Sequence, residues 1–155
     1  MLPRSIDTLP GHRRTTALLV SACLAGAAAG TVALSPPAAG ANQAQAVQLL
    51  ETKLRPSGDP DGSGKATFRI RKAKARVCAT VTWSNIGAPD AAHIHRKSDG
   101  GVVVDLTGSV TGGKNCATGV SRKLIGRILD HPRRYYFNVH NATYPAGAIQ
   151  GTLHR

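Results

Sequence analysis

Residues 76–83 read Arg76-Val77-Cys78-Ala79-Thr80-Val81-Thr82-Trp83, and their alternation is the clearest evidence for the fold class. Side chains on an extended strand point to alternate faces, so a half-buried strand shows apolar residues at every second position. The residues expected to face a core are Val77, Ala79, Val81 and Trp83. Those expected on the opposite face are Arg76, Cys78, Thr80 and Thr82. The stretch therefore predicts a β-strand with one buried side and one solvent-facing side.

Short strand-like segments separated by turn residues extend from this strand in both directions. These segments are residues 46–54, 65–71, 91–95, 102–106, 134–140 and 148–153. Glycine, proline and aspartate fill the connections between them, as turns require. Residues 121–129 differ, because their apolar residues recur at helical spacing and predict a short helix that ends before Pro132. The whole pattern predicts an all-β chain folded as an antiparallel β-sandwich with one short helix.

The N-terminal segment has a different composition. Residues 15–50 contain no Lys, Arg, Asp or Glu, follow Arg13-Arg14 and hold an apolar run at 17–34. A basic start, an apolar run and small residues after it are typical of an export signal. We therefore expect residues 1–41 to be an export signal peptide and residues 42–155 to be the secreted domain. The alternative is a retained N-terminal anchor, because the apolar run is just long enough to span a bilayer.

The cysteines are interpreted in the light of this expected export. Removal of the signal leaves two of the three, Cys78 and Cys116, which in an exported chain have a single disulfide connectivity. The bridge would close a loop of roughly 39 residues and contribute roughly 3 to 4 kcal/mol to stability. Two buried free thiols are the alternative. The residues before Cys23 loosely resemble a lipobox, and a lipid on Cys23, like a retained anchor, would place the protein at a membrane.

The chain is strongly basic, with a formal net charge of +12. Loss of residues 1–41 would remove three arginines and one aspartate and leave +10. The densest basic stretch contains Arg69, Arg71, Lys72, Lys74 and Arg76. These residues are candidates for binding an anionic cell-surface polymer, and the alternative is a solvated hairpin end. A nucleic-acid partner is disfavoured, because the whole chain supplies only six aromatic residues for base stacking.

Three histidines form the candidate site. His93 and His95 share one face of a predicted strand, and His140 lies on a second strand with Tyr136 and Asn138 on its own face. If the two strands are neighbours, three imidazoles converge, and three neutral imidazoles with an open fourth position suit Zn²⁺ or Cu²⁺. The alternative is structural, because imidazoles also bond backbone carbonyls or side chains such as Asn138 and Tyr144.

Several ordered motifs resemble the CHRD (chordin-type) domain over residues 46–155. They are Ala92-His93-Ile94-His95, Gly101-Val102-Val103-Val104-Asp105-Leu106, Pro132 ahead of Tyr135-Tyr136-Phe137-Asn138-Val139-His140, and Tyr144-Pro145-Ala146-Gly147-Ala148-Ile149-Gln150-Gly151. The resemblance implies a β-rich extracellular domain. In animals such domains occur as repeats within an antagonist of bone morphogenetic proteins, and in bacteria as small exported single-domain proteins. The chain departs from the usual pattern at Arg96, Ala148 and Gln150, where glycine, an acidic residue and arginine are usual.

A second resemblance concerns the His-x-His strand, which is similar to the copper-ligand strand of copper/zinc superoxide dismutase. The expected sandwich is accordingly immunoglobulin-like or superoxide-dismutase-like. No nucleophile elbow, P-loop or dinucleotide motif is present, and the sequence favours a non-enzymatic role.

The function expected first is an exported binding or structural module at the cell exterior. Its partner would be an unknown extracellular protein or an anionic polymer, and no cofactor would be required. The alternative is a copper or zinc protein that uses His93, His95 and His140, with dismutase-like chemistry as a further option.

Overall fold

A computed structural model describes residues 46–155, which form eight strands, one α-helix and three short 3₁₀ turns. The strands are β1 (Gln48–Pro56), β2 (Ser63–Arg71), β3 (Arg76–Ser84), β4 (Pro89–Arg96), β5 (Val102–Asp105), β6 (Cys116–Ala117), β7 (Tyr135–Asn141) and β8 (Ile149–Thr152). The helix is α2 (Arg122–Asp130), and the 3₁₀ turns are η1 (Lys72–Lys74), η2 (Thr107–Ser109) and η3 (Pro132–Arg134). Every strand expected from the sequence is present, with ends that differ by one or two residues.

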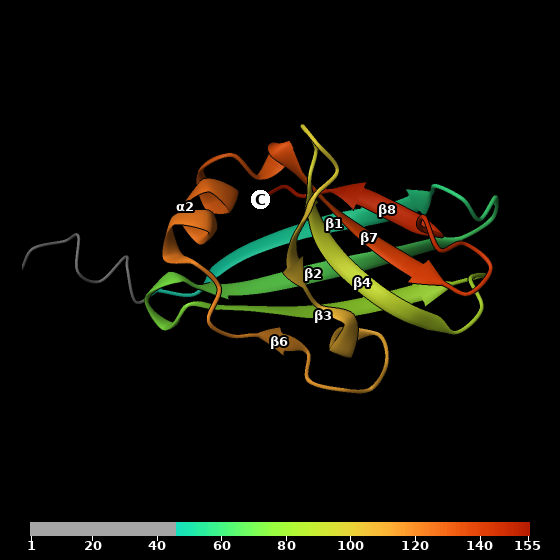
Figure 1. The fold of residues 1–155 in the computed structure, drawn as a ribbon, viewed down its shortest axis with the longest axis horizontal. Coiled ribbons are helices and arrows are strands. Elements are labelled where there is room, and N and C mark those ends of the chain that lie inside the picture. Colours follow the sequence, from blue (N-terminus) through green and yellow to red (C-terminus); the bar gives the residue numbers. More distant parts are fainter. Residues whose placement is uncertain (1–45) are drawn as a thin grey trace, which may run out of the picture. The chain divides into compact units, whose positions relative to one another are not determined.

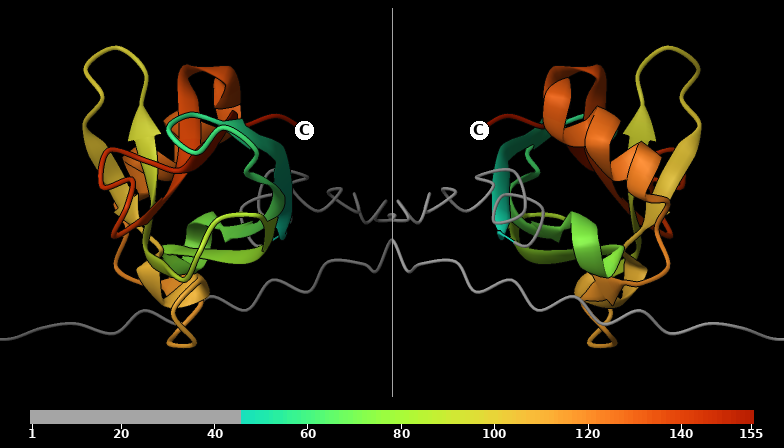
Figure 2. Two further views of the ribbon diagram at one scale, coloured as in Figure 1. Left: turned by 90° about the vertical axis from the view of Figure 1, so that its right-hand side faces the viewer. Right: turned by 90° about the vertical axis from the view of Figure 1, so that its left-hand side faces the viewer.

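The strands form two antiparallel sheets that are joined along one side (Figures 1 and 2). One sheet has the order β1-β2-β3-β6 and the other β5-β4-β7-β8. They connect where β1 pairs with β8, at Arg55↔Gln150 and Pro56↔Ile149. The result is an all-β sandwich that approaches a closed barrel, which confirms the predicted fold class.

The core lies between the two sheets. Phe68 of β2 and Phe137 of β7 are both fully buried, and their rings meet edge to face with centroids 5.2 Å apart. Edge-to-face aromatic pairs are favourable beyond the apolar area they bury. The other large side chains that are fully buried are Leu50, Leu54, Ile70, Ile94, Ile125, Ile128, Ile149 and Leu153. The inward faces of β2 and β7 are therefore those that the alternating pattern predicts.

Helix α2 lies at one end of the sheets beside the β2–β3 turn (Figure 1). Ser121 caps its first turn, with its hydroxyl accepting from the backbone N–H of Leu124. Such caps satisfy an amide that has no partner within the helix. Ile125 and Ile128 are fully buried, so one apolar face of the helix closes this end of the core. The predicted helix is confirmed.

The expectation for Trp83 is wrong. Val77 and Ala79 are buried as predicted, but Trp83 is 36% exposed. The alternation fixes which face a side chain occupies, whereas burial also requires another element over that face. Trp83 is the penultimate residue of β3 and lies beyond Val81, the last side chain of this face that packs against the core. The alternation of apolar residues along β3 therefore overestimated how far its buried face extends.

The expected export segment, residues 1–41, and Cys23 within it lie outside the described residues. Within residues 46–155, no helix has both the length and the apolar character needed to cross a membrane.

Candidate functional site

Strands β4 and β7 bring the three histidines together on the outer face of one sheet. The two strands are antiparallel neighbours, with His95 opposite Tyr136 and Ala91 opposite His140. The ring centroids of His93 and His140 are 5.1 Å apart, and those of His95 and His140 are 5.9 Å apart. One potential ligand nitrogen from each ring lies within 4.8 Å of the others.

Each imidazole has one ring nitrogen that points away from the other two rings, toward a carbonyl or carboxylate oxygen. The Nδ1 of His95 is 2.9 Å from the carbonyl oxygen of Gly100, and the Nδ1 of His140 is 3.0 Å from that of Pro145. A carbonyl only accepts, so in both rings the Nδ1 carries the hydrogen and the Nε2 keeps a free lone pair. The Nε2 of His93 lies 3.7 Å from a carboxylate oxygen of Asp105.

The remaining nitrogens face one another. The Nδ1 of His93 is 3.3 Å from the Nε2 of His140. The Nε2 of His95 is buried and has no hydrogen-bond partner among the described residues. A buried polar atom without a partner costs about 1 to 3 kcal/mol, and this nitrogen shares that condition with the neighbouring Oδ1 of Asn138.

Two residues of β7, Tyr136 and Asn138, lie next to the histidines. The ring of Tyr136 stacks on His95, with centroids 4.9 Å apart and planes inclined by 14°. Asn138 is buried between the strands, and its Nδ2 donates to the carbonyl oxygen of Ala146. The loop after β7 is therefore attached to the cluster through Asn138 as well as through His140.

The electrostatics of the cluster favour neutral imidazole at His93. Burial lowers the pKa of His93, proximity to His140 lowers it further, and Asp105 opposes both effects. The pKa of Asp105 is itself lowered, chiefly because the backbone N–H of Thr107 and then its side chain donate to the carboxylate. A neutral ring keeps a lone pair for a ligand, and the ionised carboxylate of Asp105 lies 3.7 Å from the Nε2 of His93, beyond direct hydrogen-bond distance.

Asp105 is the residue that sequence reasoning missed. The three histidines seemed to lack an acidic partner, because the acidic residue usual in the terminal motif is absent. The structure pairs β4 with β5 so that Asp105 lies opposite His93. The signal that was available is that Asp105 ends the next strand along the chain, at the position that a hairpin pairs with His93.

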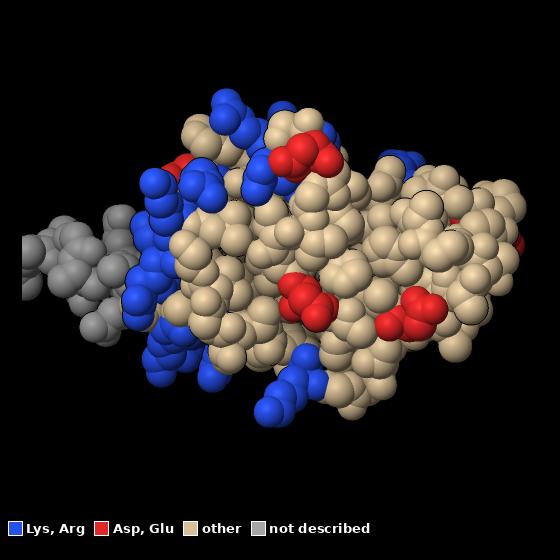
Figure 3. Space-filling model, viewed as in Figure 1, with Lys and Arg blue, Asp and Glu red and all other residues tan. Residues whose placement is uncertain are grey.

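The predicted basic stretch lies at the end of the domain that also holds α2. Its members are Arg69, Arg71, Lys72, Lys74 and Arg76. Arg122 of the helix donates to the carbonyl oxygen of Ala73 at 3.0 Å. Lys and Arg side chains gather over this end of the surface (Figure 3). The structure thus joins the basic stretch of the β2–β3 turn to cations of the helix.

The expected disulfide is present between Cys78 of β3 and Cys116 of β6. The two residues are direct partners across the β3–β6 pairing. The bond therefore fastens a two-residue edge strand, and the long loop before it, to the outer face of the sheet.

The described residues thus form a small antiparallel β-sandwich with a disulfide and a histidine cluster on the outside of one sheet. A family model, that of the CHRD domain, matches residues 38–153. The chain belongs to the CHRD domain family, which confirms the resemblance drawn from its motifs. Comparisons with curated proteins and with solved structures found no match.

Proposed function

We propose that this chain is an exported CHRD-type binding module that captures Zn²⁺ or Cu²⁺ with His93, His95 and His140. The observation that carries the proposal is the buried Nε2 of His95, which has no partner among the described residues and faces the same cluster as the other two rings. Bonding to a metal ion would satisfy this atom and two further lone pairs at once.

The outer partners of the rings support a metal site. Histidines that ligate metals usually donate their second ring N–H to a carbonyl or a carboxylate, which fixes the ring and its tautomer. Here the carbonyls of Gly100 and Pro145 accept from His95 and His140, and the carboxylate of Asp105 lies 3.7 Å from the Nε2 of His93. Two of the three rings are thus oriented by the kind of group that metal sites use, and the third has a carboxylate nearby.

The spacing of the nitrogens also supports it. Zn–N bonds of about 2.0–2.1 Å at a tetrahedral angle place two ligand nitrogens about 3.3 Å apart. The nitrogens of His93 and His140 are 3.3 Å apart. The full set spans up to 4.8 Å, so the third imidazole has to move inward by up to about 1.5 Å. Three nitrogen ligands then leave a fourth position open for water or another ligand.

The choice between zinc and copper follows from coordination chemistry. Imidazole suits both ions, and copper binds a given nitrogen site more tightly than zinc does. We therefore expect Cu²⁺ to displace Zn²⁺ at this site when both ions are available at equal concentration.

The test is metal binding by protein that carries no histidine tag. Isothermal titration should give about one equivalent of Zn²⁺ or Cu²⁺ per chain, and bound metal should raise the melting temperature by mass action. His95→Gln should weaken the affinity at least about 100-fold, because it removes one of only three protein ligands.

The matched control is His131→Gln, which removes an exposed imidazole at the end of α2 and should leave the affinity unchanged. Binding of less than about a tenth of an equivalent would overturn the proposal. Equal changes in metal affinity for His95→Gln and His131→Gln would also overturn it. In that case the hydrogen bonds from His95 and His140 to the two loops would be their whole role.

A further inference from the structure

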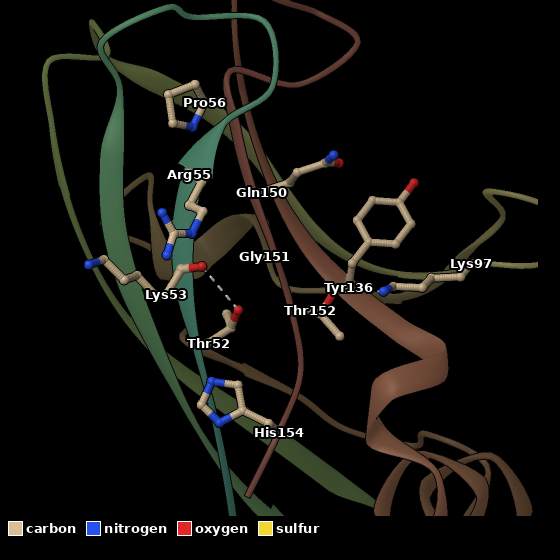
Figure 4. Close-up of a pocket in the computed structure, with 10 residues that line it drawn as sticks. All are labelled: Thr52, Lys53, Arg55, Pro56, Lys97, Tyr136, Gln150, Gly151, Thr152 and His154. Atoms are coloured by element: carbon tan, nitrogen blue, oxygen red, sulfur yellow. Dashed lines mark hydrogen bonds between the residues drawn. The ribbon is translucent and has the colours of Figure 1, made fainter.

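Two pockets lie next to each other on the surface, and none of the residues that line them belongs to the basic stretch that the sequence singles out. The first, of about 750 Å³, lies at the seam where β1 meets β8. Figure 4 shows that side chains of β1 line one side of this seam pocket and side chains of β7 and β8 the other. Its cations are Lys53, Arg55 and Lys97.

The second pocket, of about 760 Å³, lies between the β4–β5 hairpin and the segment formed by α2 and η3. These two segments are side by side in both Figures 1 and 2. The basic residues that line this hairpin pocket are Arg96, Lys97, Arg127, Arg133 and Arg134. In Figure 3, lysine and arginine atoms lie beside the hairpin tip, which itself carries acidic atoms.

Lys97 joins the two pockets, because it lines both. Its position is fixed twice, since its backbone N–H donates to the carbonyl oxygen of Arg134 and its Nζ donates to Thr152 at 2.7 Å. Among the described residues that line the two pockets, none is acidic. Asp99 pairs with Arg96 at 2.6 Å and offsets that single cation. The joined pockets therefore present a continuous cationic surface of mostly unneutralised side chains.

We propose that these joined pockets bind an anionic polysaccharide. A flexible chain with repeated sulfate, phosphate or carboxylate groups would place one anionic group in each pocket and cross Lys97 between them. Thr152, Gln150 and Ser98 line the same surface and offer the hydroxyl and amide groups that bond to sugar hydroxyls.

The aromatic side chains argue against a nucleic acid in this place. Binding of single strands relies on aromatic faces on which bases stack. Tyr135 is only 4% exposed, and one face of Tyr136 is already covered by His95. The lining thus supplies charge and hydrogen bonds rather than a stacking surface.

The experiment measures the binding of a heparin decasaccharide and of an oligothymidylate of matched charge. It uses the purified protein with EDTA present, so that the result does not depend on the proposed metal site. Heparin should bind more tightly than the oligothymidylate at an ionic strength of about 0.15 M, and its affinity should fall with salt. Equal or tighter binding of the oligothymidylate would overturn the proposal in favour of a nucleic-acid site.

Two double variants locate the site, and a third serves as a control. Lys53→Gln with Arg55→Gln changes the seam pocket, and Arg127→Gln with Arg134→Gln changes the hairpin pocket. Each should weaken heparin binding about 5- to 30-fold, as expected for two exposed charge contacts.

The control is Arg69→Gln with Arg76→Gln, which removes the same charge from exposed positions around the β2–β3 turn. This control should change the affinity less than about twofold. A loss as large as that of the pocket variants, or no loss in either pocket variant, would show that binding follows net charge or lies elsewhere. Unchanged melting temperatures would show that all three variants fold.

Discussion

Each histidine of the cluster uses its two ring nitrogens differently. In His95, one nitrogen donates to the carbonyl oxygen of Gly100 and the other is buried without a partner among the described residues. The first nitrogen fixes the ring, and the second is available for a ligand. A structural role and a binding role are therefore not exclusive at this residue, because they belong to different atoms of one ring.

At His93 the same environment makes stability depend on pH. The pKa of this ring is lowered by burial and by His140, whereas in the unfolded chain it returns to about 6.5. As the pH falls below about 6.5, the unfolded state takes up a proton that the folded state resists, so the free energy of unfolding decreases. Above that pH the contribution of His93 is fully present. The slope for a single proton is at most about 1.4 kcal/mol per pH unit.

Urea unfolding of metal-free protein between about pH 7 and pH 5 measures this effect. His93→Gln should reduce the pH dependence, whereas His131→Gln, at an exposed ring, should leave it as it is. An unaltered slope in His93→Gln would contradict the assignment.

At the scale of elements, the site depends on two loops as much as on two strands. The β4–β5 hairpin supplies the Gly100 carbonyl, and the loop after β7 supplies those of Pro145 and Ala146. Gly147 lets the second loop come close, because its φ is 128° and a Cβ there would collide with the amide of Asn138. Positive φ values are strained for residues other than glycine.

Gly147→Ala should therefore destabilise the domain by about 1 to 3 kcal/mol and also weaken zinc binding, because the displaced loop no longer orients His140. The control is Gly119→Ala, where φ is 73° but nothing lies within 4 Å of an added Cβ. It has backbone strain without the collision, so it should lower stability and leave zinc affinity unchanged. Calorimetry of unfolding together with zinc titration separates the two effects. Equal zinc affinity in both variants would show that the loop does not position the site.

At the scale of the whole molecule, two sheets meet along one short seam and share one core. The β1–β8 pairing that joins them covers only two residue pairs, and the edge-to-face contact of Phe68 with Phe137 crosses the interior between the sheets. The seam and the adjacent hairpin also create the pockets on the outside. One feature of the architecture thus both closes the sandwich and shapes its surface.

The disulfide acts at this scale, because it restricts the entire unfolded chain. Cys78 and Cys116 are 38 residues apart in the sequence, and closing such a loop reduces the entropy of the unfolded state. Replacement of both cysteines by serine should lower the free energy of unfolding by about 3 to 4 kcal/mol, measured by denaturant unfolding without reductant. The variant should match wild-type protein treated with reductant. Equal stability of the variant and the oxidised wild type would contradict this account.

The amino-acid sequence was enough to predict seven of the eight strands, the helix, the disulfide partners and the face on which His93, His95 and His140 lie, but not the two-residue strand β6. These follow from local rules, since alternation, helical spacing and turn residues act between near neighbours. It also identified the family through motifs distributed over nearly the whole domain. Trp83 marks the limit of local rules, because its burial depended on a distant element that does not cover it.

Which groups meet in the folded protein was not predictable from local patterns. The pairing of β4 with both β7 and β5 places Asp105 beside His93 and leaves the Nε2 of His95 buried. It also folds the loop after β7 onto His140, and brings the hairpin next to α2 and η3 to form a basic pocket. These contacts join segments far apart in the chain, and sheet order and loop closure are properties of the whole molecule rather than of any local pattern. The sequence thus predicted the residues of the candidate site, and the fold supplied the partners that give each ring nitrogen its role.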